Sequence, residues 1–286
     1  MFEATWHKLL ERPDGANKYD FGHVLVVGGS PGMVGAPFLA AEAALRTGAG
    51  LVTIASRADV IDKLEKRVKE IMTLSLSNDL PAAAEEIMSF IAARKVSVIV
   101  IGPGQSPDFS ALAPMLLSKL NIPVIVDAGA IAAFHGHLDL LKEAAGQNQN
   151  IILTPHAGEY QKLTGNKPPT DHQKLRQEVS RFSKDHGVTL VLKGHPTLVA
   201  HPDGQLYENP TGNPGLATAG TGDVLSGVIA GILAQHITNI EAAVYLHGLA
   251  GDLAARAKTQ PGTIASDVID QIPAALRSTV RSPAPD

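Results

Sequence analysis

Asp223 follows three small residues, Gly220, Thr221 and Gly222, directly before an apolar stretch with helical spacing. Backbone N–H groups at the start of a helix attract anions, so this turn could hold a phosphate without help from side chains. A carboxylate beside such a site is a poor phosphate ligand, but it could take a proton from a hydroxyl that attacks the phosphate. Asp223 could also simply cap the helix. The glycine-rich approach to the turn favours an anion hole with a catalytic base.

A second polar segment, Lys193–Thr197 with the sequence KGHPT, follows a run of apolar residues. A lysine at the end of a buried strand can reach a phosphate group. The glycine and the threonine of the segment offer a backbone amide and a hydroxyl to the same ligand. The segment therefore indicates a second contact with a phosphorylated molecule.

Two glycine-rich segments, Gly28–Gly35 and Gly102–Gly104, follow other predicted strands. The first has neither the spacing of a dinucleotide-binding fingerprint nor the lysine of a P-loop. Both segments would let a ligand approach the backbone closely. Both are also consistent with plain turns between a strand and a helix.

Three further polar residues, Asp127, His156 and Glu159, stand at or just after predicted strand ends. Asp127 could orient Mg²⁺ or a phosphate-bound water, or it could cap the turn that follows. His156 and Glu159 are three positions apart, so they share one face of a starting helix. They could bind a metal or a substrate, or form a capping arrangement. Asp127 and Glu159 are therefore candidate metal ligands.

The other histidines suggest less chemistry. His135 and His137 have no third ligand nearby and belong to no metalloprotease motif, so a solvated loop is predicted there. His247 lies on an apolar helical stretch, where we expect it to pack.

The candidate site residues are positioned by short apolar runs that alternate with longer segments rich in alanine and leucine. The runs are apolar throughout, as in strands covered on both faces. The predicted strands are His23–Gly28, Leu51–Ala55, Ser97–Gly102, Pro123–Asp127, Ile151–Thr154 and Thr189–Lys193. The predicted helices are Ala36–Thr47, Ala58–Lys69, Ala82–Arg94, Phe109–Leu120, His172–His186, Asp223–Gln235, Ile240–Lys258 and Ile264–Leu276.

This alternation predicts an α/β protein with a mostly parallel sheet between two layers of helices. A hairpin is predicted for Thr197–His201 and Gln205–Glu208. We expect a single domain over residues 1–286, because no linker or repeat interrupts the pattern. In such sheets, ligands bind beyond the carboxyl ends of the strands, where the segments described above stand.

Composition excludes several classes of protein. The 286 residues carry a net charge of −4 and only 4% aromatic residues, which argues against a nucleic-acid partner. The chain has no cysteine, so thiol nucleophiles, disulfides and cysteine-held metals are excluded. The sequence contains no signal-peptide pattern and no apolar run long enough to span a membrane. We therefore expect a cytoplasmic protein without a membrane partner.

The turn before Asp223 resembles the anion hole and catalytic base of the ribokinase-like superfamily. A narrower resemblance, to the ADP- or ATP-dependent NAD(P)H-hydrate dehydratase family, rests on six segments in order: GGSPGMVGAPFLAAEAALRTGAGLVTIAS, VIGPG, VDAGA, LTPHAGEYQKLTG, LKGHPT and NPTGNPGLATAGTGDVLSGVIAGILAQ. It spans residues 19–272, and the block after Asn209 is its most specific part. The resemblance implies a ribokinase-like three-layer αβα fold. It also implies a hydro-lyase that restores NADH or NADPH from the S epimer of the hydrated cofactor, while ADP gives AMP and phosphate.

The family's site residues can be carried over position by position. The resemblance implies that the nucleotide is held by Lys193, Gly194, His195, Pro196, Thr197 and Gly222. It implies that the hydrated cofactor is contacted by Ala36, Gly104, His156 and Asp223. In the implied reaction, Asp223 deprotonates the hydroxyl on the hydrated ring, and that oxygen attacks the terminal phosphate. The amides of Gly220, Thr221 and Gly222 would stabilise the transferring group, and Mg²⁺ is implied on the nucleotide phosphates.

The chain departs from the family pattern at two positions. Relatives often carry a second acid two positions after Asp127, where this chain has Gly129, so the resemblance lends little support to a metal role for Asp127. His156 occupies a position where superfamily kinases often have asparagine, which favours the dehydratase over a small-molecule kinase.

Two alternatives stay open. A small-alcohol kinase of the hydroxyethylthiazole type would use the same base but stop at the phosphate ester. A nucleotide-sensing protein without turnover would gain nothing from Asp223.

Many relatives are fused to an epimerase domain that this chain is too short to hold, so we expect a separate epimerase as partner. Relatives commonly form tetramers and single-domain bacterial members favour ADP, so a homotetramer that uses ADP is expected.

Overall fold

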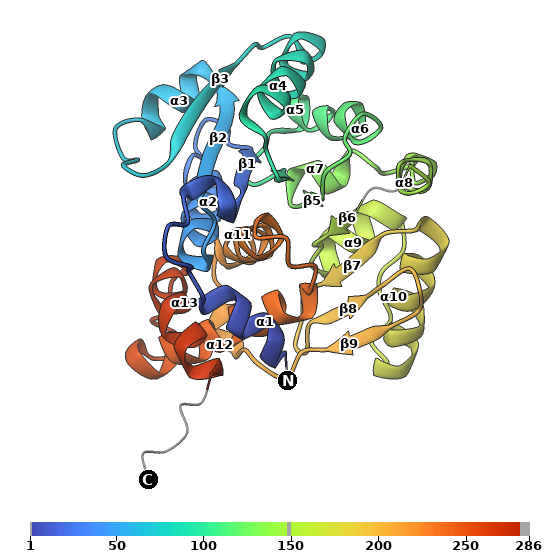
Figure 1. Ribbon diagram of the computed structural model, residues 1–286. Coiled ribbons are helices and arrows are strands. Elements are labelled where there is room, and N and C mark those ends of the chain that lie inside the picture. The colour runs from blue at the N-terminus through green and yellow to red at the C-terminus, as the bar shows by residue number, and fades with distance from the viewer. Residues whose placement is uncertain (1, 148–149, 281–286) are drawn as a thin grey trace.

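The computed structural model describes residues 2–147 and 150–280 (Figure 1). Within these residues the centre of the molecule is one nine-stranded sheet. Its strands are β1 (His23–Val27), β2 (Leu51–Arg57), β3 (Met72–Leu76), β4 (Val98–Ile101), β5 (Val124–Val126), β6 (Ile151–Leu153), β7 (Thr189–Leu192), β8 (Leu198–Ala200) and β9 (Leu206–Glu208). They lie in the order β3-β2-β1-β4-β5-β6-β7-β8-β9. Neighbours from β3 to β7 are parallel, whereas β7–β8 and β8–β9 are antiparallel.

The central strands form because both of their faces are apolar. Every residue of β1 is buried, and alternate residues such as Val24 and Leu25 join two different hydrophobic clusters on opposite faces. Such continuous apolar runs are typical of parallel strands that are covered by helices on both sides. The structure confirms the six predicted strands and the predicted hairpin, which is β8–β9.

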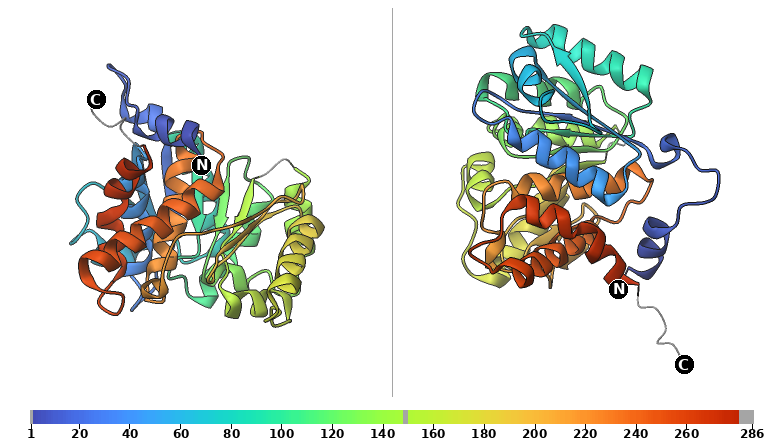
Figure 2. Two further views of the ribbon diagram at one scale, coloured as in Figure 1. Left: turned by 90° about the horizontal axis from the view of Figure 1, so that it is seen from below. Right: turned by 90° about the vertical axis from the view of Figure 1, so that its left-hand side faces the viewer.

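Two layers of helices cover the sheet, as the additional views show (Figure 2). One layer consists of α2 (Gly35–Thr47), α3 (Ala58–Leu64), α11 (Thr221–Ala234), α12 (Ile240–Lys258) and α13 (Ala265–Thr279), with α1 (Glu3–Leu10) beside α13. The other layer consists of α4 (Leu80–Arg94), α5 (Pro107–Ser110), α6 (Leu112–Leu117), α7 (Gly129–Ala132), α8 (Asp139–Ala145), α9 (Ala157–Thr164) and α10 (His172–His186). Two short 3₁₀ turns, η1 (Lys18–Phe21) and η2 (Pro214–Leu216), complete the elements. This is the predicted three-layer αβα arrangement.

Several elements differ from the sequence-based prediction; α1, α7 and α8, for example, were not among the predicted helices. The edge strand β3 was not predicted, because its sequence MTLSL mixes polar and apolar residues and only Leu76 is buried. The helix predicted for Ala58–Lys69 ends at Leu64, and the charged residues that follow lie in turns. The helix predicted for Phe109–Leu120 is broken between α5 and α6. Pro114 explains the break, since it has no N–H to donate to the carbonyl four residues earlier.

The sequence assigned no role to the first eighteen residues, and part of them forms α1. Trp6 and Leu9 of α1 are buried against the layer that contains α13. The tail 281–286, to which no role was assigned either, lies outside the described residues. Over residues 2–147 and 150–280, no helix has both the length and the apolar character needed to cross a membrane.

Candidate active site

The strand order reverses between β1 and β4, and ligands of open α/β sheets bind at such a switch point. The loops after these two strands interlock there. The amide of Gly29 donates to the carbonyl oxygen of Pro103 at 2.8 Å, and Ser30 Oγ donates to the carbonyl oxygen of Gly104 at 2.8 Å. The two glycine-rich segments of the sequence therefore form one continuous surface.

Ala36 and Gly104, which were predicted to contact the hydrated cofactor, lie against each other at this surface. A Cβ placed on Gly104 would stand 3.0 Å from the Cβ of Ala36 and 2.6 Å from the carbonyl oxygen of Met33. Gly104 also has a φ of 66°, which other residues rarely adopt. Only glycine fits here, so backbone rather than a side chain faces this side of the site.

The next three strands each deliver a charged residue to the same edge of the sheet. Asp127 follows β5, Glu159 lies in the first turn of α9 after β6, and Lys193 follows β7. The Lys193 ammonium lies 3.0 Å from Asp127 Oδ1 and 3.6 Å from Glu159 Oε2. The parallel topology explains this meeting, because carboxyl ends of adjacent parallel strands share one edge.

The two carboxylates keep Lys193 charged. The Lys193 side chain is 18% exposed and that of Asp127 only 1%. Burial disfavours the ammonium form, but the negative charges of Asp127 and Glu159 outweigh it and raise the pKa of Lys193 above its ordinary value. Lys193 is therefore a cation at neutral pH and can attract a phosphate.

His156 is the N-cap residue of α9. Its Nδ1 accepts hydrogen bonds from the amides of Gly158 at 3.0 Å and Glu159 at 3.2 Å, and Glu159 Oε2 accepts from the amide of His156 at 2.9 Å. The capping arrangement that the spacing allowed is therefore present. Because Nδ1 accepts, the proton of the neutral ring is on Nε2. This assignment places the Nε2 donor 3.5 Å from Glu159 Oε1, on a ring that is exposed beside the candidate site.

The N-terminus of α11 has no side-chain cap among the described residues, which leaves backbone N–H groups of its first turn without a side-chain acceptor. Its N-cap residue, Gly220, has a φ of 91°. The Thr221 hydroxyl donates instead to the carbonyls of Leu216 at 2.7 Å and Thr218 at 2.9 Å, which fixes the loop before the helix. The amide of Thr221 donates to the carbonyl oxygen of Thr218 at 3.4 Å, so the amides of Gly222 and Asp223 are the ones left open to an anion, and the helix dipole favours negative charge there.

Asp223 lies in the first turn of α11, beside these amides. Burial, and then the negative charge of Asp127, raise the pKa of Asp223 to about 7, against the opposing effect of Lys193. A carboxylate with such a pKa is a stronger proton acceptor than an ordinary aspartate. The side chain therefore has the protonation behaviour of a general base that works near neutral pH.

A cavity of about 380 Å³ opens beside the start of α11. The predicted site residues in its wall are His156, Lys193, Gly194, His195, Thr197, Thr221 and Gly222. Pro196, Gly220 and Asp223 are not part of this wall, although each adjoins a residue that is. The wall also lacks four other predicted site residues, Ala36, Gly104, Asp127 and Glu159. The structure therefore brings the predicted nucleotide-binding segment and the predicted anion hole to one cavity.

The rest of the cavity wall comes largely from the loop 209–217, the glycine-rich approach to α11, and from α12, neither of which supplied a predicted site residue. Asn213 Nδ2 donates to Asp252 Oδ1 at 2.9 Å, and the amide of Gly212 donates to Asp252 Oδ2 at 3.0 Å. Asp252 thereby ties the loop to α12. The turn-forming residues of the loop were visible in the sequence, but the distant partner that holds the loop was not.

His247 on α12 contributes more than the packing expected from the sequence. It is buried, it lines the cavity, and its Nε2 lies 3.0 Å from the carbonyl oxygen of Thr221. Burial lowers the pKa of His247 to about 4, so the ring is neutral and Nε2–H is the donor. The hydrogen bond holds the first residue of α11 in place.

The side chains do not form a magnesium site by themselves. Asp127 has a partner for each oxygen, Lys193 for Oδ1 and Ser226 for Oδ2, and Glu159 Oε2 accepts from the amide of His156. Across the described ranges, no group of three or more His, Asp or Glu side chains could hold a metal ion. Because Mg²⁺ prefers several free oxygen ligands in octahedral geometry, these residues do not fit a site made by the protein alone.

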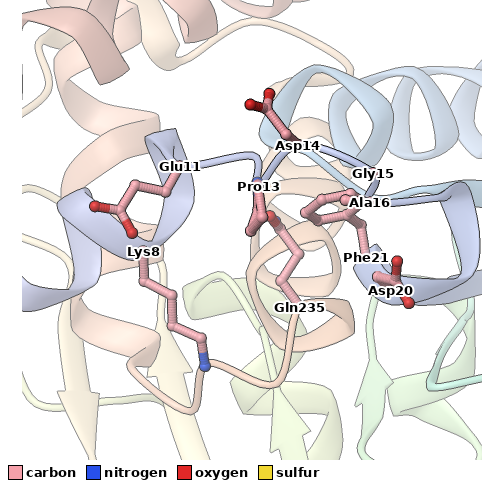
Figure 3. A pocket seen from close by; sticks show the side chains of 9 residues that line it. All are labelled: Lys8, Glu11, Pro13, Asp14, Gly15, Ala16, Asp20, Phe21 and Gln235. Carbon is pink, nitrogen blue, oxygen red and sulfur yellow. The ribbon is translucent and has the colours of Figure 1, made fainter.

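A larger hollow of about 460 Å³ lies away from these residues (Figure 3). Its wall includes Lys8 and Glu11 near the end of α1, Phe21 before β1, and Gln235 after α11. This hollow lies at the amino ends of the parallel strands, where β1 begins, whereas Lys193 lies at their carboxyl ends. The smaller cavity is therefore the candidate active site.

The mostly parallel sheet, its antiparallel edge hairpin, and a helix start without a side-chain cap beside a carboxylate are together the features of a ribokinase-like α/β protein. The match to known families is more specific. The chain belongs to the NAD(P)H-hydrate dehydratase family, whose model matches residues 24–274.

Individual relatives agree with this assignment. A bifunctional NAD(P)H-hydrate repair enzyme from Moorella thermoacetica is 40% identical over 97% of this chain and 54% of the relative. An ADP-dependent (S)-NAD(P)H-hydrate dehydratase from Neisseria meningitidis is 36% identical over 86% of this chain and 82% of the relative. The ADP/ATP-dependent NAD(P)H-hydrate dehydratase from Bacillus subtilis, co-crystallised with ATP/Mg²⁺, has a TM-score of 0.79 at 29% identity and covers 97% of each chain. The chain spans about half the length of the bifunctional relatives it matches.

Proposed function

We propose that this protein is a hydro-lyase that dehydrates the S epimer of hydrated NADH or NADPH with ADP as co-substrate. The observation that carries the proposal is Asp223, a partly buried carboxylate with a pKa of about 7 beside the uncapped start of α11. Membership of the dehydratase family supports this choice of reaction. So do relatives from Neisseria meningitidis and Enterococcus faecalis that are named ADP-dependent dehydratases.

In the proposed reaction, Asp223 takes the proton from the hydroxyl group on the hydrated ring. The freed oxygen attacks the terminal phosphorus of ADP, the bond to the bridging oxygen breaks, and AMP leaves. Phosphate then departs from the ring with the electrons of its bond to carbon, a neighbouring ring proton is lost, and the dihydropyridine is restored. Because phosphate leaves far more readily than hydroxide, the nucleotide makes the dehydration possible.

The cavity wall supplies the nucleotide contacts in this proposal. Lys193 would bind the phosphates through its ammonium, while Gly194, His195, Pro196 and Thr197 would follow the rest of the nucleotide. The amides of the Gly220–Gly222 turn would stabilise the charge that develops on the transferring group. Ala36, Gly104 and His156 would contact the hydrated cofactor, with His156 also lining the cavity that contains the nucleotide-binding residues.

We expect Mg²⁺ to enter with the nucleotide rather than to reside on the protein. The side chains around Lys193 offer no cluster of free carboxylates, and nucleotide phosphates are good oxygen ligands for this ion. Its chemistry would be to neutralise charge on the phosphates. The co-crystal structure of the Bacillus subtilis relative with ATP/Mg²⁺ is consistent with this expectation and leaves ATP as an alternative to ADP.

A small-alcohol kinase is the second candidate, because the same anion hole and base would transfer a phosphate to any well-placed hydroxyl. Such an enzyme would release a stable ester. The family match favours the dehydratase.

A nucleotide sensor is the third candidate, but in a sensor the raised pKa of Asp223 would serve no purpose.

The wider setting of the reaction is also a proposal. We infer a cytoplasmic homotetramer that receives the S epimer from a separate epimerase. The epimerase is inferred from the family resemblance, and the bifunctional relatives that this chain matches over about half their length are compatible with it.

The test is direct. Purified protein is mixed with hydrated NADH, ADP and Mg²⁺, and the absorbance of the reduced nicotinamide is followed together with AMP and phosphate. We expect all three products in equal amounts. A stable phosphorylated alcohol from a panel of thiazoles and sugars would support the kinase instead. Tight ADP binding without turnover of any acceptor would support the sensor.

A further inference from the structure

Ser226 joins two parts of the candidate site that are far apart in sequence. It is fully buried one turn after Gly222 in α11, and its hydroxyl donates to Asp127 Oδ2. The same hydroxyl lies 3.1 Å from the carbonyl oxygen of Gly222. Asp127 Oδ1 in turn accepts from Lys193 Nζ at 3.0 Å. Ser226, Asp127 and Lys193 therefore form one chain of hydrogen bonds, from α11 through the end of β5 to the end of β7.

The burial of Asp127 makes both of its partners necessary. At 1% exposure, its carboxylate is cut off from water, and a buried charge is tolerated only when its oxygens are paired. Ser226 satisfies Oδ2 with a neutral donor, which leaves Oδ1 for the ammonium. Without the serine hydroxyl, Oδ2 would lose its donor, and the Lys193 ammonium, already bonded to Oδ1, could turn toward it.

The position of the Lys193 ammonium matters because it lies directly against the predicted anion hole. A Cβ placed on Gly222 would stand 3.0 Å from Lys193 Nζ. The ammonium and the first amides of α11 therefore converge on one place. A lysine side chain has many rotamers, so its head stays at this place only if a partner holds it there.

The backbone beside Asp127 also shows that this position is tightly determined. Ala128 has a φ of 47° and a ψ of −121°, although it is not a glycine. Such conformations cost free energy and persist only where the surrounding contacts enforce them. The carboxylate of Asp127 is thus held both by its hydrogen bonds and by the turn that follows it.

We propose that Ser226 and Asp127 are positioning residues for Lys193: the serine hydroxyl occupies one oxygen of Asp127 and so keeps the ammonium at the start of α11, where phosphate binds. This inference rests on the proposed nucleotide-dependent function. It gives Asp127 a role other than metal binding, and it gives Ser226 a role that acts only through Lys193.

The test measures ADP affinity by calorimetry without the hydrated cofactor, so it does not depend on turnover. Ser226→Ala should weaken ADP binding about tenfold, as expected for loss of a hydrogen bond to a charged group. In a Lys193→Gln background the same substitution should change ADP affinity by less than about twofold, since residues that act through one another are not additive. Unchanged affinity in Ser226→Ala, or an equal loss in both backgrounds, would overturn the inference.

Ser183→Ala is the matched control. Ser183 is also a fully buried serine, and its hydroxyl donates to the carbonyls of Val188 and Ala200. These contacts lie at the start of β7, at the other end of the strand from Lys193. It should lower the thermal midpoint about as much as Ser226→Ala does, while leaving ADP affinity unchanged. An equal loss of ADP affinity in Ser183→Ala would mean that general destabilisation is responsible, and would overturn the inference.

A third variant separates positioning from metal binding. In Asp127→Asn, the Mg²⁺ concentration that gives half-maximal turnover should stay within about twofold of wild type, because Asp127 is not a metal ligand in this proposal. A tenfold rise in that Mg²⁺ concentration would show that Asp127 is a metal ligand and would overturn this part of the proposal. If the wild-type protein binds ADP but dehydrates nothing, the proposed function fails, and the binding measurements still decide whether Ser226 positions Lys193.

Discussion

Asp223 illustrates how the properties of one side chain depend on its surroundings. The start of a helix favours a carboxylate, and so does the nearby Lys193. Burial and the negative charge of Asp127 act in the opposite direction and prevail, which leaves the pKa of Asp223 at about 7. A sequence motif can place an aspartate after a glycine-rich turn, but this balance appears only in the folded protein.

The pH dependence of the reaction should follow Asp223. The carboxyl group accepts a proton only when it is ionised, so kcat/KM should rise through about pH 7 and level off above it. The profile is measured with hydrated NADH as the varied substrate at constant ionic strength. A profile that stays flat from roughly pH 5 to pH 9 would show that another group is the base.

Asp223→Asn should stabilise the protein at alkaline pH. The folded-state pKa of about 7 lies above the value of 3.8 expected in the unfolded chain, so ionisation costs the folded state stability as pH rises. Removal of the charge should increase the free energy of unfolding at pH 8 by up to about 4 kcal/mol. The gain should shrink as pH falls and disappear below about pH 4. Denaturant titrations at several pH values test this, and a gain that does not depend on pH would contradict it.

At the scale of elements, α11 is placed by direct backbone contact with α2. A Cβ on Gly227 of α11 would lie 2.1 Å from the carbonyl oxygen of Ala40 and 2.8 Å from the Cβ of Ala43. The helices can approach this closely only because Gly227 has no side chain. The contact fixes the direction of α11, and with it the anion hole at its first turn.

Gly227→Ala should therefore destabilise the fold by about 1–3 kcal/mol, because the added methyl overpacks the contact between α11 and α2. Gly35→Ala is the control, since a Cβ there meets nothing within 4 Å and its φ is not positive. The control should change the free energy of unfolding by less than about 0.5 kcal/mol. Chemical denaturation measures both, and equal effects of the two substitutions would refute the packing argument.

The sequence predicted those elements whose signal is local and strong. The central strands and the hairpin were found because their apolar runs and turn residues are contiguous. The edge strand β3 was missed because MTLSL alternates polar and apolar residues and has no continuous apolar run. The break between α5 and α6 was missed because helical spacing continues past Pro114, although the hydrogen bonding does not.

The same distinction applies to the candidate site. The segments around Lys193 and Asp223 could be singled out because each combines glycines with a charged residue at an element end. Ser226 could not, since its partner Asp127 is 99 positions away and only the sheet topology brings the two together. The contact between His247 and Thr221 could not be predicted for the same reason, because only the fold brings the two residues together.

At the scale of the whole molecule, the sheet places the two halves of the site along one edge. The segments after β1 and β4 carry Ala36 and Gly104, which were predicted to contact the hydrated cofactor, and the segment after β7 carries the predicted nucleotide-binding residues Lys193–Thr197. His156, also predicted to contact the cofactor, follows β6 between them. The first turn of α11 lies between the two halves. In the proposed reaction, the hydroxyl of the bound cofactor must reach both Asp223 and the nucleotide.

The protein should therefore act on one epimer of the hydrated cofactor. With a mixture of the two epimers, conversion should stop when the S epimer is used up, because the hydroxyl of the other epimer would point away from the phosphate. Addition of an epimerase should restart it. Chromatography of the remaining hydrate gives the answer, and complete conversion of both epimers without an epimerase would contradict this expectation.

The most direct measurement compares wild-type protein with Asp223→Asn in two assays, recovery of reduced-nicotinamide absorbance from hydrated NADH with ADP and Mg²⁺, and ADP binding. If Asp223 is the base of a nucleotide-dependent dehydration, the variant should lose the activity by a factor of about 10² or more, since a general base contributes that much. Its ADP affinity should stay close to that of the wild type. Substantial dehydration by Asp223→Asn would contradict the proposed mechanism.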